Sequence, residues 1–598
     1  MKLEVDLPGV LGAAGKTLLV IGAAQLAPVL AALAGGGPWW PLLVGAAGTV
    51  AAGVLLLPLG RGLRQWRRRE SLAVASLSWA LATAGAAVPF VAAGACGPID
   101  ALFESASGLT TTGATVFADV DGMHRLPRLE LEAWDPLLQR GYLSGAWYDA
   151  APGRGQELGE AARALGLGAE VRPRRDPAGR LLELLPAGPH EAPHAAPLHL
   201  WRAICHWLGG AGIVLLVLVL LPWLGQGEAL LRSQRAEASF LTERYRGSTR
   251  ATVKGLLVVY VGATSVLIAA LLALGVGPWS AVLHAFATIS TGGFSPHTAS
   301  LGAYGPAVQL VVTAFMAFGA LNFAVLGRTM DEQLSAWRRA GRERGPLGAA
   351  WVVARGTVPG ITRAVWRSSE TRAYLFLLAG SAAAIAALLV LEGDPRYVGA
   401  SGARGALLDS TVTAVSISTT TGFCTADFGG WPPACQVILV GLMLVGGCSG
   451  STAGGLKMRR VLLASYFLWR ELRRLPRPNA VMPIKLGGTV VPEEHVREAV
   501  GFIAVYLLLV GLATLLVAGG GTDLLSAGSS AVASLGSVGP GLGLCGPSGS
   551  FSPFDASAKL VLTVVMLLGR LEILAPLAVS LPSFWLRRRT PGQAREAG

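Results

Sequence analysis

The stretch Thr419-Thr420-Thr421-Gly422-Phe423 follows a short, mostly apolar segment, and three related stretches occur elsewhere in the chain. They are Thr110-Thr111-Thr112-Gly113-Ala114, Ser290-Thr291-Gly292-Gly293-Phe294 and Ser537-Val538-Gly539-Pro540-Gly541. Glycine lets the backbone turn its carbonyl groups inward, and four such loops around one axis can replace the water around an ion. The pattern therefore predicts an ion-conducting membrane protein.

Composition agrees with a membrane protein. The 598 residues are 52% hydrophobic and only 14% charged, whereas about 25% of the residues of a soluble chain are charged. Several nearly uncharged stretches reach the ~20 residues that cross a bilayer. The opening Met1-Lys2-Leu3-Glu4-Val5-Asp6 is not a basic signal-peptide start, so the first apolar stretch is predicted to be a retained helix.

The net charge of +13 is concentrated in basic runs between the apolar segments. These runs are 61–69, 232–250, 338–344, 457–477 and 587–589. Cytoplasmic loops of membrane proteins are enriched in Lys and Arg, so the distribution predicts a membrane topology rather than nucleic-acid binding. With the N-terminus inside, every basic connection is cytoplasmic and all four glycine loops face outward.

Two apolar segments, 11–34 and 38–60, are followed by four copies of one unit: long helix, half-helix, glycine loop and return helix. The predicted elements are 71–95, 98–109, 110–116 and 198–222; 251–276, 278–289, 290–295 and 302–328; 372–393, 405–418, 419–424 and 433–470; and 496–519, 522–534, 536–543 and 557–586. The half-helices are too short to span a bilayer and must re-enter from one side. We expect an all-α, multi-pass membrane protein with four pseudo-symmetric helix–pore-loop–helix repeats around one pore, preceded by two extra helices.

This organisation predicts five regions and one insert. They are two leading helices at 1–69, a first repeat at 70–222, a second at 250–330, a third at 370–475, a fourth at 490–589, and a polar insert at 118–197 within the first. The insert is rich in charge, Pro and Gly, and we expect it to lie outside with no predicted fold. His190 and His194 within it and His199 just after it are irregularly spaced, which favours a solvated loop over a metal site.

Six further segments show a resemblance to one known family. They are 103–115, 206–213, 319–323, 446–457, 538–543 and 569–574, in family order. The chain resembles the membrane subunit of the Trk/Ktr/HKT superfamily of potassium transporters, closest to the bacterial Trk type. The insert is not covered by this resemblance.

The resemblance implies a selectivity filter in the four glycine loops. The filter residues are Thr111, Thr112, Gly113, Thr291, Gly292, Thr420, Thr421, Gly422, Val538 and Gly539, with potassium at Thr112, Thr291, Thr421 and Val538. Sodium remains the alternative ion, because the loops keep little of the potassium-channel sequence TVGYG beyond its glycine.

The run 446–457 interrupts the third return helix, and the resemblance implies an intramembrane gating loop there. Its gating residues are Gly446, Gly447, Gly450, Ser451, Thr452, Gly454, Gly455 and Lys457, together with Arg570. Arg570 is a functional candidate in its own right, because an intramembrane arginine is energetically expensive. Glu572 faces elsewhere on a regular helix and is a poor partner for it.

By resemblance the protein is no enzyme, needs no cofactor beyond potassium as substrate, and sits in the bacterial cytoplasmic membrane. The implied partners are membrane lipid, a second copy of the chain and a cytoplasmic nucleotide-binding regulatory subunit, and no nucleic acid. The alternatives are a sodium-coupled or alternating-access secondary transporter, and an intramembrane enzyme for which no acid–base or metal set is found.

Two side-chain questions stay open at the level of sequence. Glu104 and Asp409 lie on half-helices, where they either brace the filter or add negative charge to a vestibule. The six cysteines suggest neither zinc nor a disulfide framework. One bridge among Cys96, Cys424 and Cys545 is possible near the outer face.

Overall fold

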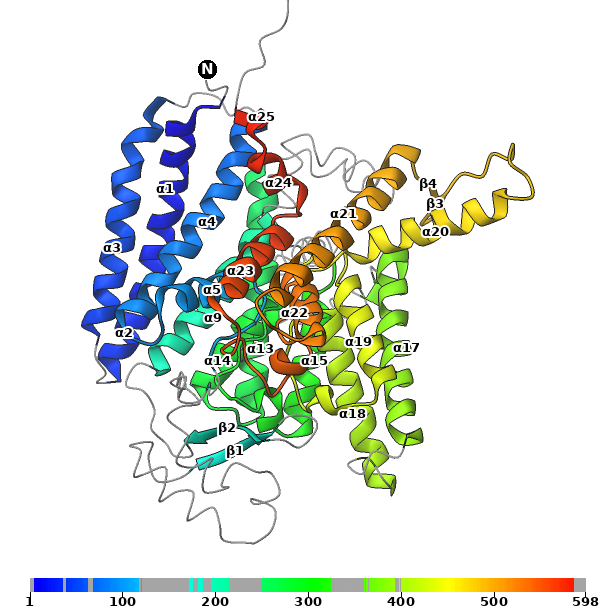
Figure 1. The fold of residues 1–598 in the computed structure, drawn as a ribbon, viewed down its shortest axis with the longest axis horizontal. Helices are drawn as coiled ribbons and strands as arrows, with labels where there is room; N and C mark the ends of the chain where they lie inside the picture. Colours follow the sequence, from blue (N-terminus) through cyan, green and yellow to red (C-terminus); the bar gives the residue numbers. More distant parts are fainter. Residues whose placement is uncertain are drawn as a thin grey trace, which may run out of the picture.

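Helices account for nearly all regular structure in the computed structural model (Figure 1). It describes residues 5–35, 39–62, 68–117, 120, 171–175, 181–186, 195–215, 249–323, 326, 339, 360, 362–363, 365–392, 397 and 399–585.

The leading segments form α1 (Leu7–Ala24), α2 (Leu26–Ala34) and α3 (Trp40–Leu56), which continues into η1 (Leu57–Gly62). Glycines let α1 and α3 approach closely, since a methyl group on Gly15 would lie 3.0 Å from the carbonyl oxygen of Gly53. At the end of α1, the amide of Gln25 donates to the carbonyl oxygen of Gly85 at 2.8 Å. This bond ties the leading helices to α4 (Arg68–Ala92), which packs against both α1 and α3.

The same order of elements then occurs four times. The first unit comprises α4, α5 (Pro98–Leu109) and α9 (Ala195–Leu215); the second α13 (Thr249–Ala273), α14 (Pro278–Ile289), η4 (Ser300–Ala303) and α15 (Pro306–Gly319); the third α17 (Ser369–Leu391), α18 (Gly399–Ser418), η6 (Phe428–Gly430) and α19 (Pro433–Val445); the fourth α21 (Glu493–Ala518), α22 (Leu524–Gly536), η7 (Gly543–Cys545) and α23 (Ala556–Arg570). The predicted half-helices 98–109 and 278–289 are confirmed residue for residue. The third begins at Gly399 rather than at 405.

The half-helices lie in the centre of the molecule, with the long helices around them (Figure 1). Their C-terminal halves are buried on all sides, as in α22, where Ser529 to Gly536 are all buried. Serine, alanine and glycine fill these turns, and such small residues allow backbones to approach closely within a membrane.

The return helices of the second, third and fourth units are broken. The interruption predicted at 446–457 is confirmed, because α19 ends at Val445 and α20 (Met458–Arg474) begins after it. The continuous helices predicted at 302–328 and 557–586 are wrong. α15 ends at Gly319, and α23 ends at Arg570 before α24 (Leu574–Ser580) and α25 (Pro582–Trp585). Glu572 and Ile573 have positive φ angles, which no α-helix can contain.

Two hairpins complete the described structure. β1 (Val171–Arg175) pairs antiparallel with β2 (Leu181–Pro186) inside the insert, and β3 (Lys485–Leu486) pairs with β4 (Thr489–Val490) beyond α20. The rest of the insert before 195, apart from residue 120, lies outside the described residues, and so do His190 and His194. For His199 the expected solvated loop is wrong, because this residue is buried on α9.

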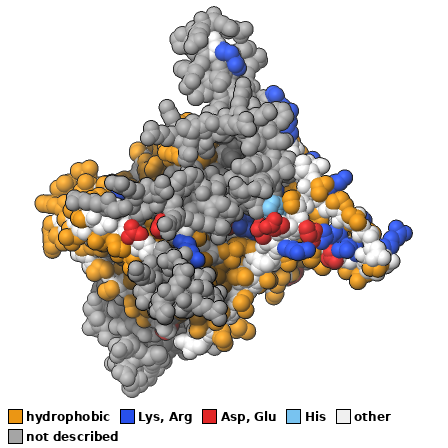
Figure 2. Space-filling view, turned by 90° about the horizontal axis from the view of Figure 1, so that it is seen from above, with side chains coloured by type: hydrophobic (Ala, Val, Ile, Leu, Met, Phe, Trp, Pro, Cys, Tyr) orange, Lys and Arg blue, Asp and Glu red, His pale blue; other side chains and the backbone are white. Residues whose placement is uncertain are grey.

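Six helices among the described residues are long and apolar enough to cross a membrane. They are Leu7–Ala34, Trp40–Gly60, Arg69–Ala92, Gly255–Ala273, Ser369–Leu391 and Glu493–Ala518. Outward-facing apolar side chains such as Leu55, Phe376 and Leu508 are more than 60% exposed, and Figure 2 shows hydrophobic side chains spread over the flanks. The fold is that of an all-helical, multi-pass membrane protein.

Candidate ion pathway

The four glycine loops share one backbone conformation. Each half-helix ends, a hydroxyl residue takes a φ near +55°, and two residues later a glycine takes a φ between +81° and +103°. The hydroxyl residues are Thr111, Thr291, Thr420 and Ser537, and the glycines are Gly113, Gly293, Gly422 and Gly539. Side chains rarely adopt such angles, so four occurrences at equivalent positions define one repeated element.

These angles shift the register of the second loop by one residue. The sequence pattern aligns Gly292 with Gly113, Gly422 and Gly539, whereas the structure aligns Gly293 with these three glycines. Gly292 is instead equivalent to Thr112, Thr421 and Val538. The doublet Gly292-Gly293 made the choice ambiguous. The spacing from Pro98 to Gly113 equals that from Pro278 to Gly293 (113 − 98 = 293 − 278) and could have decided it.

The loops meet one another in a closed ring, in chain order. A methyl group on any ring glycine would collide with a carbonyl oxygen of a neighbouring loop. The pairs are Gly113 with Gly292, Gly293 with Thr421, Gly422 with Val538, and Gly539 with Thr112. Four equivalent carbonyl groups, one from each loop, therefore lie at the four seams, and any side chain at the ring glycines would push the loops apart.

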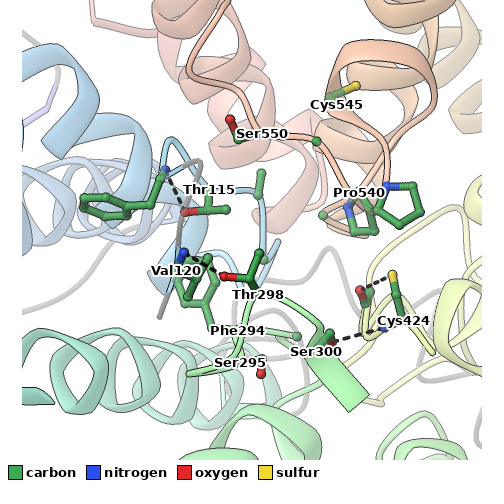
Figure 3. Close-up of a pocket in the computed structure, with 18 of the residues that line it drawn as sticks. Thr115, Val120, Phe294, Ser295, Thr298, Ser300, Cys424, Pro540, Cys545 and Ser550 are labelled. Atoms are coloured by element: carbon green, nitrogen blue, oxygen red, sulfur yellow. Dashed lines mark hydrogen bonds between the residues drawn. The ribbon is translucent and has the colours of Figure 1, made fainter. Parts of the chain in front are cut away.

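A cavity of about 90 Å³ opens in front of this ring. All four ring glycines line it, as do the residues that follow them in each loop. Figure 3 shows that the surrounding segments are tied together. Thr298 accepts a hydrogen bond from the backbone of Val120 at 3.1 Å, and Ser300 accepts one from the backbone of Cys424 at 3.2 Å.

Glu104 and Asp409 both brace the loops. Glu104 accepts from the backbone N–H of Val116 at 3.0 Å and from Thr115 Oγ1 at 3.1 Å. Asp409 accepts from Thr425 Oγ1 at 2.8 Å and from the hydroxyl of Tyr397 at 2.9 Å. Each carboxylate thus joins its half-helix to the chain that leaves the ring, so the contacts support the bracing role.

The loop 446–457 is closed at its base and attached at its tip. At the base, the backbone N–H groups of Leu456 and Lys457 donate to the carbonyl oxygens of Leu444 and Val445, both at 3.0 Å. Its lysine also donates to Ala453 inside the loop, as Ser451 does to Cys448. The loop is therefore a folded lobe rather than an open connection.

The tip of this lobe touches three half-helix ends. Thr452 Oγ1 donates to the carbonyl oxygens of Gly319 at 2.9 Å and Ile289 at 3.2 Å. The backbone of Gly454 donates to Thr420 Oγ1 at 2.7 Å, and a methyl group on Gly454 would collide with Gly536. Residues before the ring glycines therefore contact the lobe, while residues after them line the cavity.

Arg570 joins this lobe to the first unit. Its side chain is 3% exposed and donates from Nη1 to the carbonyl oxygen of Thr452 at 2.8 Å and from Nη2 to that of Gly209 at 3.3 Å. Glu572 does not pair with it, as expected, and forms a 2.7 Å ion pair with Arg460 of α20.

Arg202 was missed by sequence reasoning. It lies 2% exposed on α9, with Nε 2.7 Å from Glu104 Oε1. The rule that singled out Arg570, an arginine within an apolar helix, applies equally to Arg202 and could have found it.

All six cysteines are free and buried, so the bridge left open at the outer face is not formed. Within the part of the chain that the structure describes, no three His, Cys, Asp or Glu side chains gather as a metal site.

Comparison with known proteins decides the family. The profile described as "TrkH: Cation transport protein" matches residues 190–341 and 360–583, more than half of the chain. The chain belongs to this family. The resemblance to the bacterial Trk type is confirmed, and the family is one of membrane transporters, not enzymes.

Individual relatives extend over nearly the whole chain. A Trk system potassium uptake protein TrkH of Halomonas elongata is 29% identical over 96% of this chain and 98% of its own length. The TrkH protein of Escherichia coli K12 is 28% identical over 87% of this chain and 86% of its own length. The crystal structure of the potassium transporter TrkH from Vibrio parahaemolyticus superposes with a TM-score of 0.70 at 28% identity, covering 97% of this chain and 99% of that one.

Proposed function

We propose that this TrkH-family chain takes up potassium across the bacterial cytoplasmic membrane through the ring of four loops. The observation that carries the proposal is the closed ring itself, with one equivalent carbonyl group at each seam. Rings of backbone carbonyls replace the hydration shell of an ion in potassium filters. The relatives named as potassium uptake proteins support potassium as the ion.

The ion site consists of the carbonyl oxygens of Thr112, Gly292, Thr421 and Val538, with Gly292 taking the place expected for Thr291. Four half-helices direct their C-terminal ends at the ring, and the negative end of each helix dipole stabilises a cation there. Thr111, Thr291 and Thr420 stand one residue earlier, where Thr420 contacts the lobe.

The lobe 446–457 and Arg570 form the gate. Arg570 is a fixed positive charge beside the half-helix ends, and its hydrogen bonds hold the lobe in place. At an effective dielectric of 20, a cation 4 Å from such a charge is repelled by about 4 kcal/mol. Moving the lobe and this arginine aside would remove that barrier.

In the membrane, the N-terminus lies inside and the ring cavity opens outward. The chain functions as a homodimer and binds a cytoplasmic nucleotide-binding regulatory subunit. The basic runs in the sequence support this orientation, because the positive-inside rule assigns Lys- and Arg-rich connections to the cytoplasm.

The decisive experiment measures rubidium-86 and sodium-22 uptake into vesicles that contain only the purified chain. We expect rubidium uptake driven by an imposed membrane potential, competed by potassium and independent of sodium. Uptake that requires a sodium gradient would instead support the alternating-access carrier, for which inverted repeats rather than four parallel units are typical.

Topology has its own test. The insert 118–197 is expected to lie outside and to be dispensable for conduction. Protease added to intact spheroplasts should cut it. Cutting only in inside-out vesicles would overturn the orientation.

A further inference from the structure

The four return helices can be aligned by a glycine near the end of each. In three units this glycine packs on a carbonyl group at the C-terminal end of the half-helix of the same unit. The pairs are Gly209 with Leu109, Gly319 with Ile289, and Gly569 with Leu535. In the third unit, Gly446 stands as far from Pro433 as Gly319 does from Pro306 (446 − 433 = 319 − 306), so the alignment extends to all four.

This alignment shows that the first unit departs from the other three at two buried positions. Seven residues before the glycine the units carry Arg202, Val312, Leu439 and Leu562, and three residues before it His206, Met316, Met443 and Met566. All eight side chains are buried. On the half-helices, nine residues before the ring glycine, the equivalents are Glu104, His284, Thr413 and Ser530. Only the first unit therefore has oppositely charged side chains at these positions, and the other three units have no ion pair there.

The pair sits at the seam between the first and second loops. Glu104 binds Thr115 and Val116, which follow the ring glycine of the first loop. The guanidinium of Arg202 lies 3.8 Å from the ring centroid of Phe294, which follows the ring glycine of the second loop. The ring of His206 stacks on Phe294 at 4.0 Å and 15°, so Phe294 contacts both side chains.

Arg202 also lines the cavity in front of the ring, although Nε is bound to Glu104. Its Nη1 has no hydrogen-bond partner in the described part of the chain. A second buried pair, Lys559 with Asp100 at 2.9 Å, is equally buried but does not line the cavity. A buried pair is weak support for a role in stability, since apolar replacements of such pairs are often neutral.

We propose that Arg202 is a specificity-determining residue that, together with Glu104, keeps the charge at the cavity balanced and thereby disfavours divalent cations relative to potassium. This inference rests on the proposed function. Coulomb energy scales with the charge of the ion, so an uncompensated Glu104 attracts a divalent cation twice as strongly as a monovalent one. An uncompensated Arg202 repels it in the same proportion.

The probe is barium block of rubidium-86 uptake by the full chain in vesicles. We expect R202Q to lower the half-blocking barium concentration about tenfold or more, and E104Q to raise it, since one added charge changes binding by more than the 1.4 kcal/mol of a tenfold step. The double variant E104S/R202L copies the fourth unit and should return the value to within about twofold of wild type. The matched control is K559Q, which breaks the pair outside the cavity lining and should leave barium block unchanged.

R202Q and E104Q both lose the contact between the two side chains. If they shift the half-blocking barium concentration in opposite directions, loss of that bracing contact therefore cannot be the cause. Shifts of the same sign in R202Q and E104Q, or an equal shift in K559Q, would overturn the assignment. If R202Q fails to fold, E104Q and E104S/R202L still decide it, because neither buries an uncompensated carboxylate. If the wild type takes up rubidium but barium block is unshifted in R202Q and E104Q, only this assignment is refuted. If the wild type takes up no rubidium, the proposed function is refuted as well.

Discussion

The ring of four loops and the lobe 446–457 are both rich in glycine, but glycine serves them differently. In the ring, each glycine allows a neighbouring loop to pack its carbonyl group against the backbone, and four such contacts close a circle. In the lobe, Gly446 and Gly455 let the two ends of the lobe pack closely against each other, since a methyl group on Gly455 would lie 2.7 Å from Cα of Gly446.

This difference separates a rigid part from a detachable one. No loop of the ring can move without disturbing both neighbours. The lobe is held in place by hydrogen bonds that include those from Thr452 to Gly319, from Gly454 to Thr420 and from Arg570 to Thr452. A neutral bond contributes about 1 kcal/mol and a bond from a charged group about 1.5–3 kcal/mol. Ring substitutions should therefore change which ion passes, and lobe substitutions how fast it passes.

The largest effect is expected for Gly422→Ser in the ring. Serine would have to adopt a φ of +84°, and its Cβ would collide with the carbonyl oxygen of Val538 and lie 2.8 Å from Cδ of Pro540. We expect the potassium-to-sodium permeability ratio to fall about tenfold or more, corresponding to at least 1.4 kcal/mol, while the protein still inserts. Bi-ionic flux in vesicles measures this ratio.

Gly521→Ser is the matched control, because Gly521 has a φ of +87° with no atom near its missing Cβ. It carries the left-handed backbone cost of about 1–2 kcal/mol without the collision. An unchanged permeability ratio in Gly422→Ser, or an equal fall in the control, would remove the ring from the filter.

Arg570→Ala should raise uptake about tenfold or more, since it deletes both the repelling charge and the bonds to Thr452 and Gly209. Arg570→Lys keeps the charge but cannot donate to both carbonyl groups at once, so its uptake rate should lie between those of the wild type and Arg570→Ala. Rubidium uptake at fixed membrane potential checks both. Wild-type rates in folded variants would make Arg570 a structural brace only.

A smaller effect is expected for Thr452→Val, which keeps the shape of the side chain but loses the bonds to Gly319 and Ile289. Losing about 1 kcal/mol of attachment should raise uptake about fivefold without changing selectivity. Ser451→Ala is the control, because its hydroxyl donates to Cys448 within the lobe and has no other partner among the described residues. A selectivity change in Thr452→Val would contradict the division between ring and lobe.

The smallest effect concerns Asp555, which belongs to neither region. It caps α23 by accepting from the backbone of Ala558 at 3.0 Å. The hydroxyl of Ser557, with backbone N–H groups, holds the pKa of Asp555 below its ordinary 3.8. Its contribution is therefore present above that ordinary pKa and lost as pH falls through the lowered one. Asp555→Ala should cost about 1 kcal/mol, seen as a lower melting temperature near neutral pH that converges with wild type in acid.

Selectivity and uptake rate should not change in Asp555→Ala. A change in either would show that a less stable α23 is enough to alter conduction. The separate roles assigned to the ring and the lobe would then not hold.

Much of the site was predictable because its signals are local. The short, mostly apolar segments before the glycine loops predicted the half-helices 98–109 and 278–289, which the structure confirms. The glycines of 446–457 predicted the interruption between α19 and α20. The breaks at 320–322 and after Arg570 were missed, because Leu321, Leu571 and Ile573 continue an apolar pattern that a helix could also satisfy.

The sequence by itself determined the membrane class, the four units and the Trk-type family, since hydrophobic length, glycine position and motif order are properties of short segments. Tertiary structure alone decided which carbonyl group each ring glycine packs against, that Arg202 meets Glu104, and that Arg570 bonds to Thr452 and Gly209. These contacts join residues about a hundred or more positions apart, and no local pattern records which carbonyl group a distant glycine must accommodate.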